Sequence, residues 1–383
     1  MKIILKGIFA ILISSILITL SVFLNTPKLY NIEQELSIVK RPPLEEEILE
    51  QMSLEERVGQ LFVFGFSGSE VSENITDLIQ ENHISGVLLL GTNIVNNTQL
   101  SKLITDIQEI SKLPLLITID QEGGIVARLK GNEILTIAQK QMSTPQQAYD
   151  IAKERGEQLI TVGVNVNLAP VVEYITSSNS FMYHRVFRGT KEDVAQKAEA
   201  AIKGYTDSNT ISVAKHYPGH SDSSPDSHYS LPKVYIKNSQ WDEYIYPFKY
   251  LIEKKVVDVI MVGHIFYPNI DSKTSTISSE ILNTRLREQL GFQGVLITDD
   301  MEMDSIEKQG NYTEIAKQAL LAGNDILLYS GIPKVQREVY EYILQSVKNG
   351  EIPETTINEK VLRVLRLKIK YGLIDYTNLQ FAE

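Results

Sequence analysis

The chain has no cysteine among its 383 residues. Disulfide bonds, thiolate metal sites and a cysteine nucleophile are therefore excluded, as is a lipid attached to an N-terminal cysteine. Positive charge is also scarce, because 37 Lys and Arg face 48 Asp and Glu for a formal net charge of −11. A nucleic-acid partner favours a basic stripe, so the composition argues against one.

Two phosphate-binding motifs are missing as well. The sequence contains no glycine-rich loop that ends in Lys-Ser or Lys-Thr, and no G-x-G-x-x-G fingerprint. A nucleotide-dependent enzyme is therefore not indicated. Apolar residues are plentiful at 43% of the chain, so a large core can form.

An uncharged apolar run stands at the N-terminus. It extends from Gly7 to Leu24, and Lys2 and Lys6 precede it. The run is just long enough to span a bilayer as a helix, and no clear small-x-small cleavage site follows it. We therefore predict an uncleaved signal anchor with an exported folded part; the alternative is a cleaved signal peptide and a secreted protein.

The rest of the chain divides into a short tether and one folded domain. Residues 1–25 are the predicted anchor or signal peptide, residues 26–48 have the composition of a polar tether, and residues 49–383 form the domain. Ser53 and Glu56 have the spacing of a capping box that opens a helix at the start of this domain.

Within the domain, short apolar runs of β type alternate with longer helical stretches. The predicted strands are residues 60–66, 85–91, 113–120, 163–170, 211–218, 256–264, 294–300 and 324–330. Strands that are apolar on both faces and alternate with helices form a parallel sheet covered by helices. Eight such units in one domain predict the α/β class and a (β/α)8 barrel.

Active sites of such barrels lie at the carboxyl ends of the strands. The polar residues at these ends are Asp120, Gln121, Glu122, Asn167, Lys215, His216, His264, Asp299 and Asp300. We expect the chemistry among them, with Glu122 structural and His264 outside the catalytic set. Adjacent strand residues point to opposite sides, so one of Asp299 and Asp300 is expected to face the site and the other to cap the next helix.

Three of the six histidines lie within residues 215–232, KHYPGHSDSSPDSHYSLP. They are His216, His220 and His228, and Asp222 and Asp226 lie among them. His216 and His220 have the spacing of two metal ligands on one face of a helix, but the intervening Pro218 and Gly219 disfavour a helix. A zinc or iron site therefore ranks below a catalytic loop.

The catalytic interpretation rests on Asp226 and His228, which are two residues apart. In an extended segment such residues face the same way, so the carboxylate can orient the imidazole and stabilise its protonated form. A histidine held in this way is suited to transfer protons near neutral pH. The alternative is a surface turn that contains a histidine.

KHYPGH (215–220), followed by DSH (226–228), resembles the signature of glycoside hydrolase family 3, specifically of its bacterial β-N-acetylglucosaminidase branch. Five further blocks resemble the same branch: DQEGGIVARL (120–129), NLAPVVE (167–173), HRVF (184–187), MVGHIFYP (261–268) and GFQGVLITDDMEM (291–303). They occur in the family's order and at similar spacing, which makes the resemblance specific.

The resemblance implies a role for each matching residue. Asp299 is the expected nucleophile at the anomeric carbon, and His228 is the expected general acid and base, paired with Asp226. The residues expected to bind the N-acetylglucosamine ring are Asp120, Arg128, Arg185, Lys215 and His216. No metal or organic cofactor is implied. The expected protein is an exo-acting β-N-acetylglucosaminidase of cell-wall fragments, monomeric and located outside the cytoplasm.

The sequence departs from the pattern of this branch in several places. Ile125 stands where the branch has Arg, Ser221 replaces the Gly after PGH, and Pro225 stiffens the loop. The chain also ends soon after the predicted barrel. We therefore expect a single catalytic domain without the C-terminal α/β sandwich domain that many relatives carry.

Three other functions stay open. A covalent glycosyl-enzyme can be resolved by phosphate instead of water, which gives a GlcNAc phosphorylase with the same residues. A β-glucosidase is disfavoured by the histidine loop. A sugar-binding protein without turnover is disfavoured by the complete set of Asp226, His228 and Asp299.

Overall fold

The computed structural model describes residues 42–222, 225–227 and 229–375. The predicted anchor, most of the tether and His228 lie outside these residues. The chain divides into two compact units, Met1–Glu47 and Ile48–Glu383, and helix α3 (Leu44–Gln51) has residues in both. Among the described residues, no helix combines the length and the apolar character that crossing a membrane requires.

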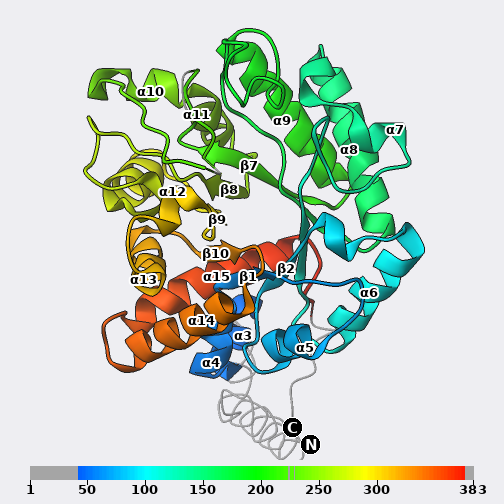
Figure 1. Cartoon of the computed structure of the whole chain (residues 1–383), viewed down its shortest axis with the longest axis vertical. Helices are drawn as coiled ribbons and strands as arrows, with labels where there is room; N and C mark the ends of the chain where they lie inside the picture. Colours follow the sequence, from blue (N-terminus) through cyan, green and yellow to red (C-terminus); the bar gives the residue numbers. More distant parts are fainter. Residues whose placement is uncertain (1–41, 223–224, 228, 376–383) are drawn as a thin grey trace, which may run out of the picture. The chain divides into compact units, whose positions relative to one another are not determined.

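Eight parallel strands of the second unit close into a barrel (Figure 1). They are β1 (Phe62–Gly65), β2 (Gly86–Leu89), β3 (Leu116–Ile119), β6 (Val166–Asn167), β7 (Ile211–Tyr217), β8 (Val259–Val262), β9 (Val295–Asp300) and β10 (Ile326–Tyr329). Their order around the barrel is β1-β10-β9-β8-β7-β6-β3-β2. An antiparallel hairpin, β4 (Gln121–Gly123) and β5 (Val126–Ala127), follows β3. The predicted (β/α)8 barrel is confirmed.

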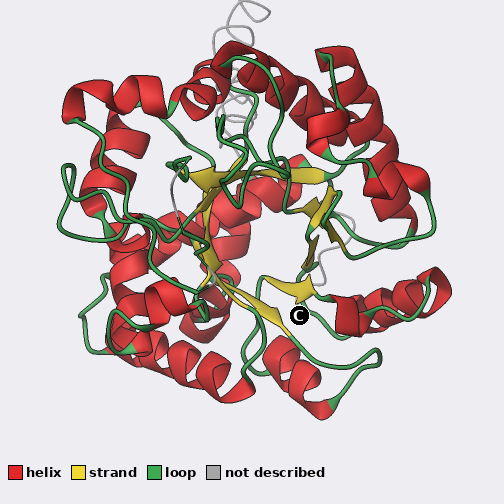
Figure 2. Ribbon diagram, turned by 45° about the horizontal axis from the view of Figure 1, so that its top comes forward, coloured by secondary structure: helices red, strands yellow, loops and turns green. Residues whose placement is uncertain are grey.

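Helices surround the strands (Figure 2). The longer ones are α4 (Leu54–Gly59), α5 (Glu73–Gln80), α6 (Asn97–Glu109), α8 (Pro145–Thr161), α9 (Lys191–Asp207), α11 (Tyr246–Glu253), the π-helix η5 (Glu280–Gln289), α13 (Tyr312–Ala322), α14 (Pro333–Lys348) and α15 (Glu354–Lys370). Short turns of helix are η1 (Gly91–Asn93), α7 (Glu133–Thr136), η2 (Gln139–Gln141), η3 (Asn238–Gln240), α10 (Trp241–Tyr244), η4 (Ser275–Ile277) and α12 (Asp304–Glu307).

The first helix of the second unit begins as the sequence predicts. The Ser53 hydroxyl accepts the Glu56 N–H at 3.1 Å, and the Glu56 carboxylate accepts the Ser53 N–H at 2.8 Å. These two bonds form a capping box at the start of α4, which satisfies two backbone donors that a helix start leaves open.

The barrel interior is apolar, and helix α15 adds side chains to it. Strand residues such as Val213 and Val295 belong to one buried cluster with Val364, Leu367 and Tyr371 of the α15 region. The Tyr371 hydroxyl donates to Asp258, which precedes β8, at 2.9 Å. Helix α15 therefore covers the amino-terminal end of the barrel, and the carboxyl ends of the strands are left for a site.

Strand β6 is much shorter than the predicted strand 163–170, and asparagine side chains of this segment add bonds to the backbone of the β3 region. The Asn165 amide accepts the Ile117 N–H at 2.8 Å and donates to the Leu115 carbonyl at 3.0 Å. The Asn167 amide makes the same two bonds with the backbone of Gln121, both at 3.0 Å. These amides fix the end of β3, where the predicted Asp120 begins its loop.

A buried lysine lies on α15, away from the predicted site. Lys368 is fully buried, and its ammonium donates to Gln60 Oε1 at 2.9 Å. Burial lowers the pKa of Lys368 to about 7. The ordinary value is roughly 10.4, so the shift corresponds to a cost of about 5 kcal/mol for keeping the charged form in the fold.

Lys368 gives the protein a pH-dependent stability. Between pH 7 and the ordinary lysine pKa, the unfolded chain binds a proton that the folded chain does not, so the free energy of unfolding rises with pH. Lys368→Met is expected to raise Tm at pH 6 by roughly 5 °C, and this gain should shrink as the pH approaches 10. Thermal unfolding across this range measures it. Lys370→Met is the control, because Lys370 is exposed and paired with Asp258; a gain that does not vary with pH would contradict the assignment.

Candidate active site

A cavity of about 180 Å³ lies at the carboxyl ends of the strands. Six of the eight predicted site residues line it: Asp120, Arg128, Arg185, Lys215, His216 and Asp299. Ser227, which stands between the other two, also lines it. The structure therefore brings distant segments of the sequence together at one place.

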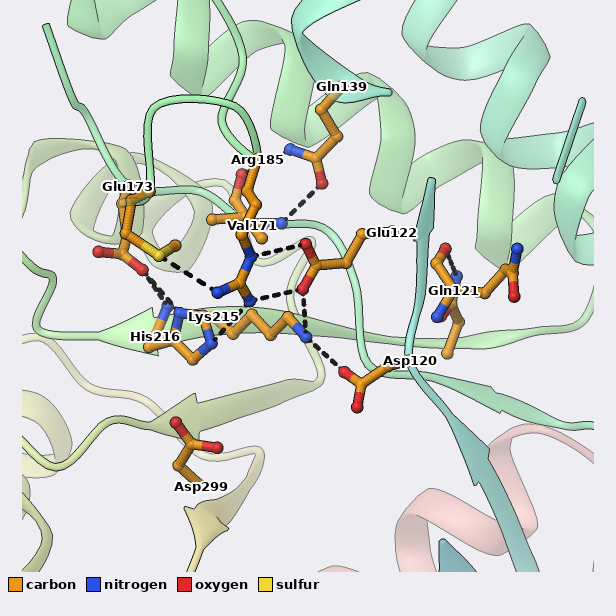
Figure 3. Close-up of polar contacts among 12 residues, drawn as sticks. Asp120, Gln121, Glu122, Gln139, Val171, Glu173, Arg185, Lys215, His216 and Asp299 are labelled. Atoms are coloured by element: carbon orange, nitrogen blue, oxygen red, sulfur yellow. Dashed lines mark hydrogen bonds and ion pairs between the residues drawn. The ribbon is translucent and has the colours of Figure 1, made fainter. Parts of the chain in front are cut away.

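A network of charges surrounds the buried Glu122, and its members Asp120, Arg185 and Lys215 line the cavity (Figure 3). Arg185 donates two bonds to this carboxylate, from Nε at 2.9 Å and from Nη2 at 2.7 Å. Lys215 Nζ lies 2.7 Å from Glu122 Oε1 and 2.6 Å from Asp120 Oδ1. Glu122 thus holds two of the predicted sugar-binding cations, a structural role larger than its place beside Asp120 suggested.

Each charge in this network is stabilised by its neighbours. Burial alone would raise the pKa of Glu122, but Arg185 and Lys215 hold that pKa well below its usual range. Burial would lower the pKa of Lys215, but Asp120 and Glu122 outweigh it and raise that pKa. Glu122 and Lys215 are therefore ionised near neutral pH, and the cavity has fixed positive donors beside Asp120.

Asp299 ends β9 on the other side of the cavity. Burial would raise its pKa, but His216, His264, the Asp300 N–H and Lys215 together lower it to about 2. The Asp300 N–H donates to Asp299 Oδ1 at 2.9 Å. The side chain is therefore a carboxylate near neutral pH.

Asp300 differs from the expectation for the second residue of the pair. It also lines the cavity, and the residue at the N-cap of α12 is Met303, without a side-chain bond. The Asp300 carboxylate instead accepts the N–H groups of Glu302 and Ser330, each at 3.0 Å. Burial raises its pKa to about 6. The strand ends at Asp300, so the alternation of a regular strand does not apply to it.

His264 follows β8 and is fully buried. Its ring nitrogens lie 2.6 Å from the Thr276 hydroxyl and 3.0 Å from the Asp300 carbonyl oxygen. Both ring nitrogens are therefore hydrogen bonded. This histidine therefore supports the end of β9 through its contact with the Asp300 carbonyl oxygen.

Glu173 is a central residue that sequence reasoning did not assign. Its Oε1 lies 2.6 Å from His216 Nδ1, and its Oε2 lies 3.0 Å from His220 Nδ1. It also accepts the backbone N–H groups of both histidines. The only signal was its place at the end of the NLAPVVE block, where the compared branch has Asp.

The ring of His216 has a defined proton position. Arg185 Nη2 lies 3.5 Å from His216 Nε2, and arginine only donates, so Nε2 is the acceptor and Nδ1 carries the proton. Burial lowers the pKa of His216 despite the adjacent Glu173 carboxylate. His216 is therefore neutral at neutral pH and keeps its orientation through bonds on both ring nitrogens.

Glu173, His216 and His220 are also a possible ligand set for a metal ion, since one ligand atom from each lies within 4.8 Å of the others. Two imidazoles and a carboxylate suit zinc or iron. The two Nδ1 atoms are, however, already hydrogen bonded to Glu173. The arrangement is thus explained by hydrogen bonds alone.

The carbonyl of Asp226 makes hydrogen bonds to residues three and four positions along the chain. The Asp226 carbonyl accepts the N–H groups of Tyr229 and Ser230 at 3.1 and 3.2 Å. These bonds differ from the extended segment that was expected at Asp226, and the pairing of Asp226 with His228 stays a prediction. His228 lies outside the described residues, and Ser227 brings this segment to the cavity wall.

Residues at the start of the same loop are hydrogen bonded to neighbouring segments of the chain. The Asp222 carboxylate accepts the Thr176 and Ser177 N–H groups at 2.7 and 2.9 Å. The Gly219 carbonyl accepts the hydroxyls of Tyr244 and Tyr267. These bonds hold the residues on either side of Ser221, so the Ser in place of Gly is accommodated.

The hairpin after β3 positions Arg128 and exposes Ile125. Gln121 Oε1 accepts the Arg128 N–H at 2.9 Å, and Arg128 Nη2 lies 3.6 Å from Asp120 Oδ2. Ile125 is 72% exposed. Asp120 therefore keeps two cationic neighbours, Lys215 and Arg128, although Ile125 stands where related sequences have Arg.

Comparison with known proteins gives consistent matches. The Glycosyl hydrolase family 3 N terminal domain matches residues 53–367. A beta-hexosaminidase of Glaesserella parasuis is 31% identical over 316 residues, which are 80% of this chain and 90% of that protein. One of Histophilus somni is 28% identical over 331 residues, 84% of this chain and 92% of that protein.

Solved structures agree with the sequence matches. A glycoside hydrolase family 3 beta-N-acetylglucosaminidase from a Paenibacillus strain superposes with a TM-score of 0.80 at 31% identity, over 86% of this chain and 67% of that chain. A beta-N-acetylhexosaminidase from Beutenbergia cavernae has a TM-score of 0.77 at 27% identity, over 83% of this chain and 98% of that chain.

Proposed function

This chain belongs to glycosyl hydrolase family 3, and from this premise we propose that it is a retaining, exo-acting β-N-acetylglucosaminidase of cell-wall fragments. It is a glycoside hydrolase, and its relatives are beta-hexosaminidases and beta-N-acetylglucosaminidases.

The proposed reaction has two displacements. The Asp299 carboxylate attacks the anomeric carbon while His228, oriented by Asp226, protonates the departing oxygen. A water molecule then gives a proton to His228 and displaces the sugar from Asp299. The observation that carries this proposal is the half-buried Asp299 carboxylate in the cavity, where its neighbours lower its pKa to about 2.

The sugar is proposed to lie across the barrel mouth. In the strand order, β3 and β9 stand four strands apart, so Asp120 and Asp299 lie at opposite sides of the closed barrel. With the anomeric carbon at Asp299, the hydroxyl-bearing end of the ring meets Asp120, Lys215 and Arg128. These three charged side chains leave little room beyond the terminal sugar, which supports cleavage at a chain end.

The rim of the barrel supports a substrate of more than one sugar. Tyr174, Tyr229 and Tyr235 are 42%, 76% and 71% exposed, and they lie on loops that follow β6 and β7. Flat aromatic faces at such positions suit contacts with further sugar rings or with attached peptides. A muropeptide outside the cytoplasm, reached from a membrane-anchored enzyme, is the substrate and the setting that we propose from the N-terminal run.

The full chain in detergent micelles should release p-nitrophenol from p-nitrophenyl β-N-acetylglucosaminide in buffer alone, with free GlcNAc as the sugar product. The corresponding β-glucoside should react much more slowly. Absorbance gives the rate, and chromatography identifies the sugar. Release that requires phosphate and yields GlcNAc-1-phosphate would make the protein a phosphorylase, and preference for the glucoside would make it a β-glucosidase.

A further inference from the structure

His220 lines the cavity, and one of its ring nitrogens has no partner among the described residues. The residue is 3% exposed and lines the cavity. Its Nε2 is buried and has no hydrogen-bond partner among the described residues. Buried side-chain polar atoms usually have partners, so this atom calls for an explanation.

The other ring nitrogen fixes the orientation of the imidazole. His220 Nδ1 lies 3.0 Å from Glu173 Oε2, and the His220 N–H donates to the same oxygen at 2.5 Å. An ionised carboxylate only accepts, so Nδ1 carries the proton. In the neutral ring Nε2 is then a hydrogen-bond acceptor.

Packing prevents the ring from turning away. The ring of Phe181 meets that of His220 edge to face, with centroids 5.1 Å apart, and the ring of His216 lies 5.5 Å away at 79°. His216 has the same bond to Glu173, but its Nε2 has Arg185 as a donor. Both histidines bond to Glu173, but among the described residues only His220 has no hydrogen-bond partner at Nε2.

We propose that His220 is a substrate-contacting residue whose Nε2 accepts a hydrogen bond from an O–H or N–H group of the bound N-acetylglucosaminyl unit. This inference rests on the proposed function and adds a residue to the sugar-binding set. A buried acceptor without a donor is unfavourable, and a ligand that donates to it recovers that free energy. Nε2 of His220 therefore favours a sugar that presents an O–H or N–H donor to it.

The variant His220→Asn separates the two ring nitrogens. Its side-chain N–H can replace Nδ1–H beside Glu173, while nothing replaces Nε2. We expect kcat/KM for p-nitrophenyl β-N-acetylglucosaminide to fall roughly 10- to 100-fold, with a matching loss of affinity for GlcNAc in calorimetry. The control is His83→Asn, which should keep full activity. His83 lies before β2, away from the cavity, and asparagine tolerates its backbone φ of 51°.

A second measurement uses the unaltered chain and does not depend on a variant that folds. In ¹⁵N spectra, His220 Nε2 should give the signal of an unprotonated nitrogen, and GlcNAc should move it upfield. Unchanged GlcNAc affinity in His220→Asn, a protonated Nε2, or equimolar Zn²⁺ binding that leaves GlcNAc affinity unaffected would each overturn the proposal. Absence of GlcNAc binding and turnover in the wild type would overturn the proposed function as well.

Discussion

Replacing Asp299 with asparagine should reduce kcat for p-nitrophenyl β-N-acetylglucosaminide by roughly 10⁴-fold. The amide has nearly the same shape and can still accept the Asp300 N–H, which donates to Oδ1 at 2.9 Å. It cannot attack the anomeric carbon as a carboxylate does, so the first displacement fails. Stopped assays with purified variant measure the residual rate.

The neighbouring carboxylate provides a matched control. Asp300→Asn keeps an oxygen for the N–H groups of Glu302 and Ser330, so its kcat should fall by no more than roughly 10-fold. The pKa of about 2 at Asp299 also predicts that this group causes no acid limb of kcat/KM above pH 4. Equal losses in the two variants, or a larger loss for Asp300→Asn, would contradict the choice of nucleophile.

Replacing Glu122 with glutamine should lower the free energy of unfolding by about 3–5 kcal/mol. Glu122 is 1% exposed and bonds to both Arg185 and Lys215. The amide preserves the volume but leaves these cations with less negative charge in a buried place. Urea unfolding followed by fluorescence gives the change, and the sugar affinity should fall with it because both cations line the cavity.

An exposed ion pair provides the control for the Glu122 variant. Glu354 is paired with Arg57 at 3.1 Å, and its side chain is 56% exposed. Glu354→Gln should change the free energy of unfolding by less than about 1 kcal/mol. Similar effects for the two glutamine variants would mean that the Glu122 network does not stabilise the fold as its burial indicates.

The fold follows from the sequence because eight apolar runs alternate with helical stretches, and only a closed parallel sheet buries all of them. The carboxyl-end rule then selected Asp120, Lys215 and Asp299, which the structure brings to one cavity. Their chemical roles remain predictions. The rule works here because it depends only on strand direction. The alternation of strands with helices already implies that all strands run the same way.

Contacts between different loops could not be predicted from the sequence. Glu173 reaches two histidines more than forty residues away, and no local pattern encodes that distance. The Asp226 carbonyl likewise accepts the N–H groups of Tyr229 and Ser230, where the spacing alone suggested an extended segment. Burial of Lys368 arises from the helix crossing the barrel end, a tertiary feature that its own segment does not specify.

Trapping the covalent intermediate tests the central claim most directly. A 5-fluoro analogue of N-acetylglucosaminyl fluoride has a good leaving group and a slowed second step, so a glycosyl-enzyme should accumulate. After proteolysis, mass spectrometry should find the sugar on the peptide that contains Asp299, with fragmentation placing it on that residue. A sugar on Asp300 or on any other residue, or turnover of the analogue without an adduct, would contradict a retaining mechanism through Asp299.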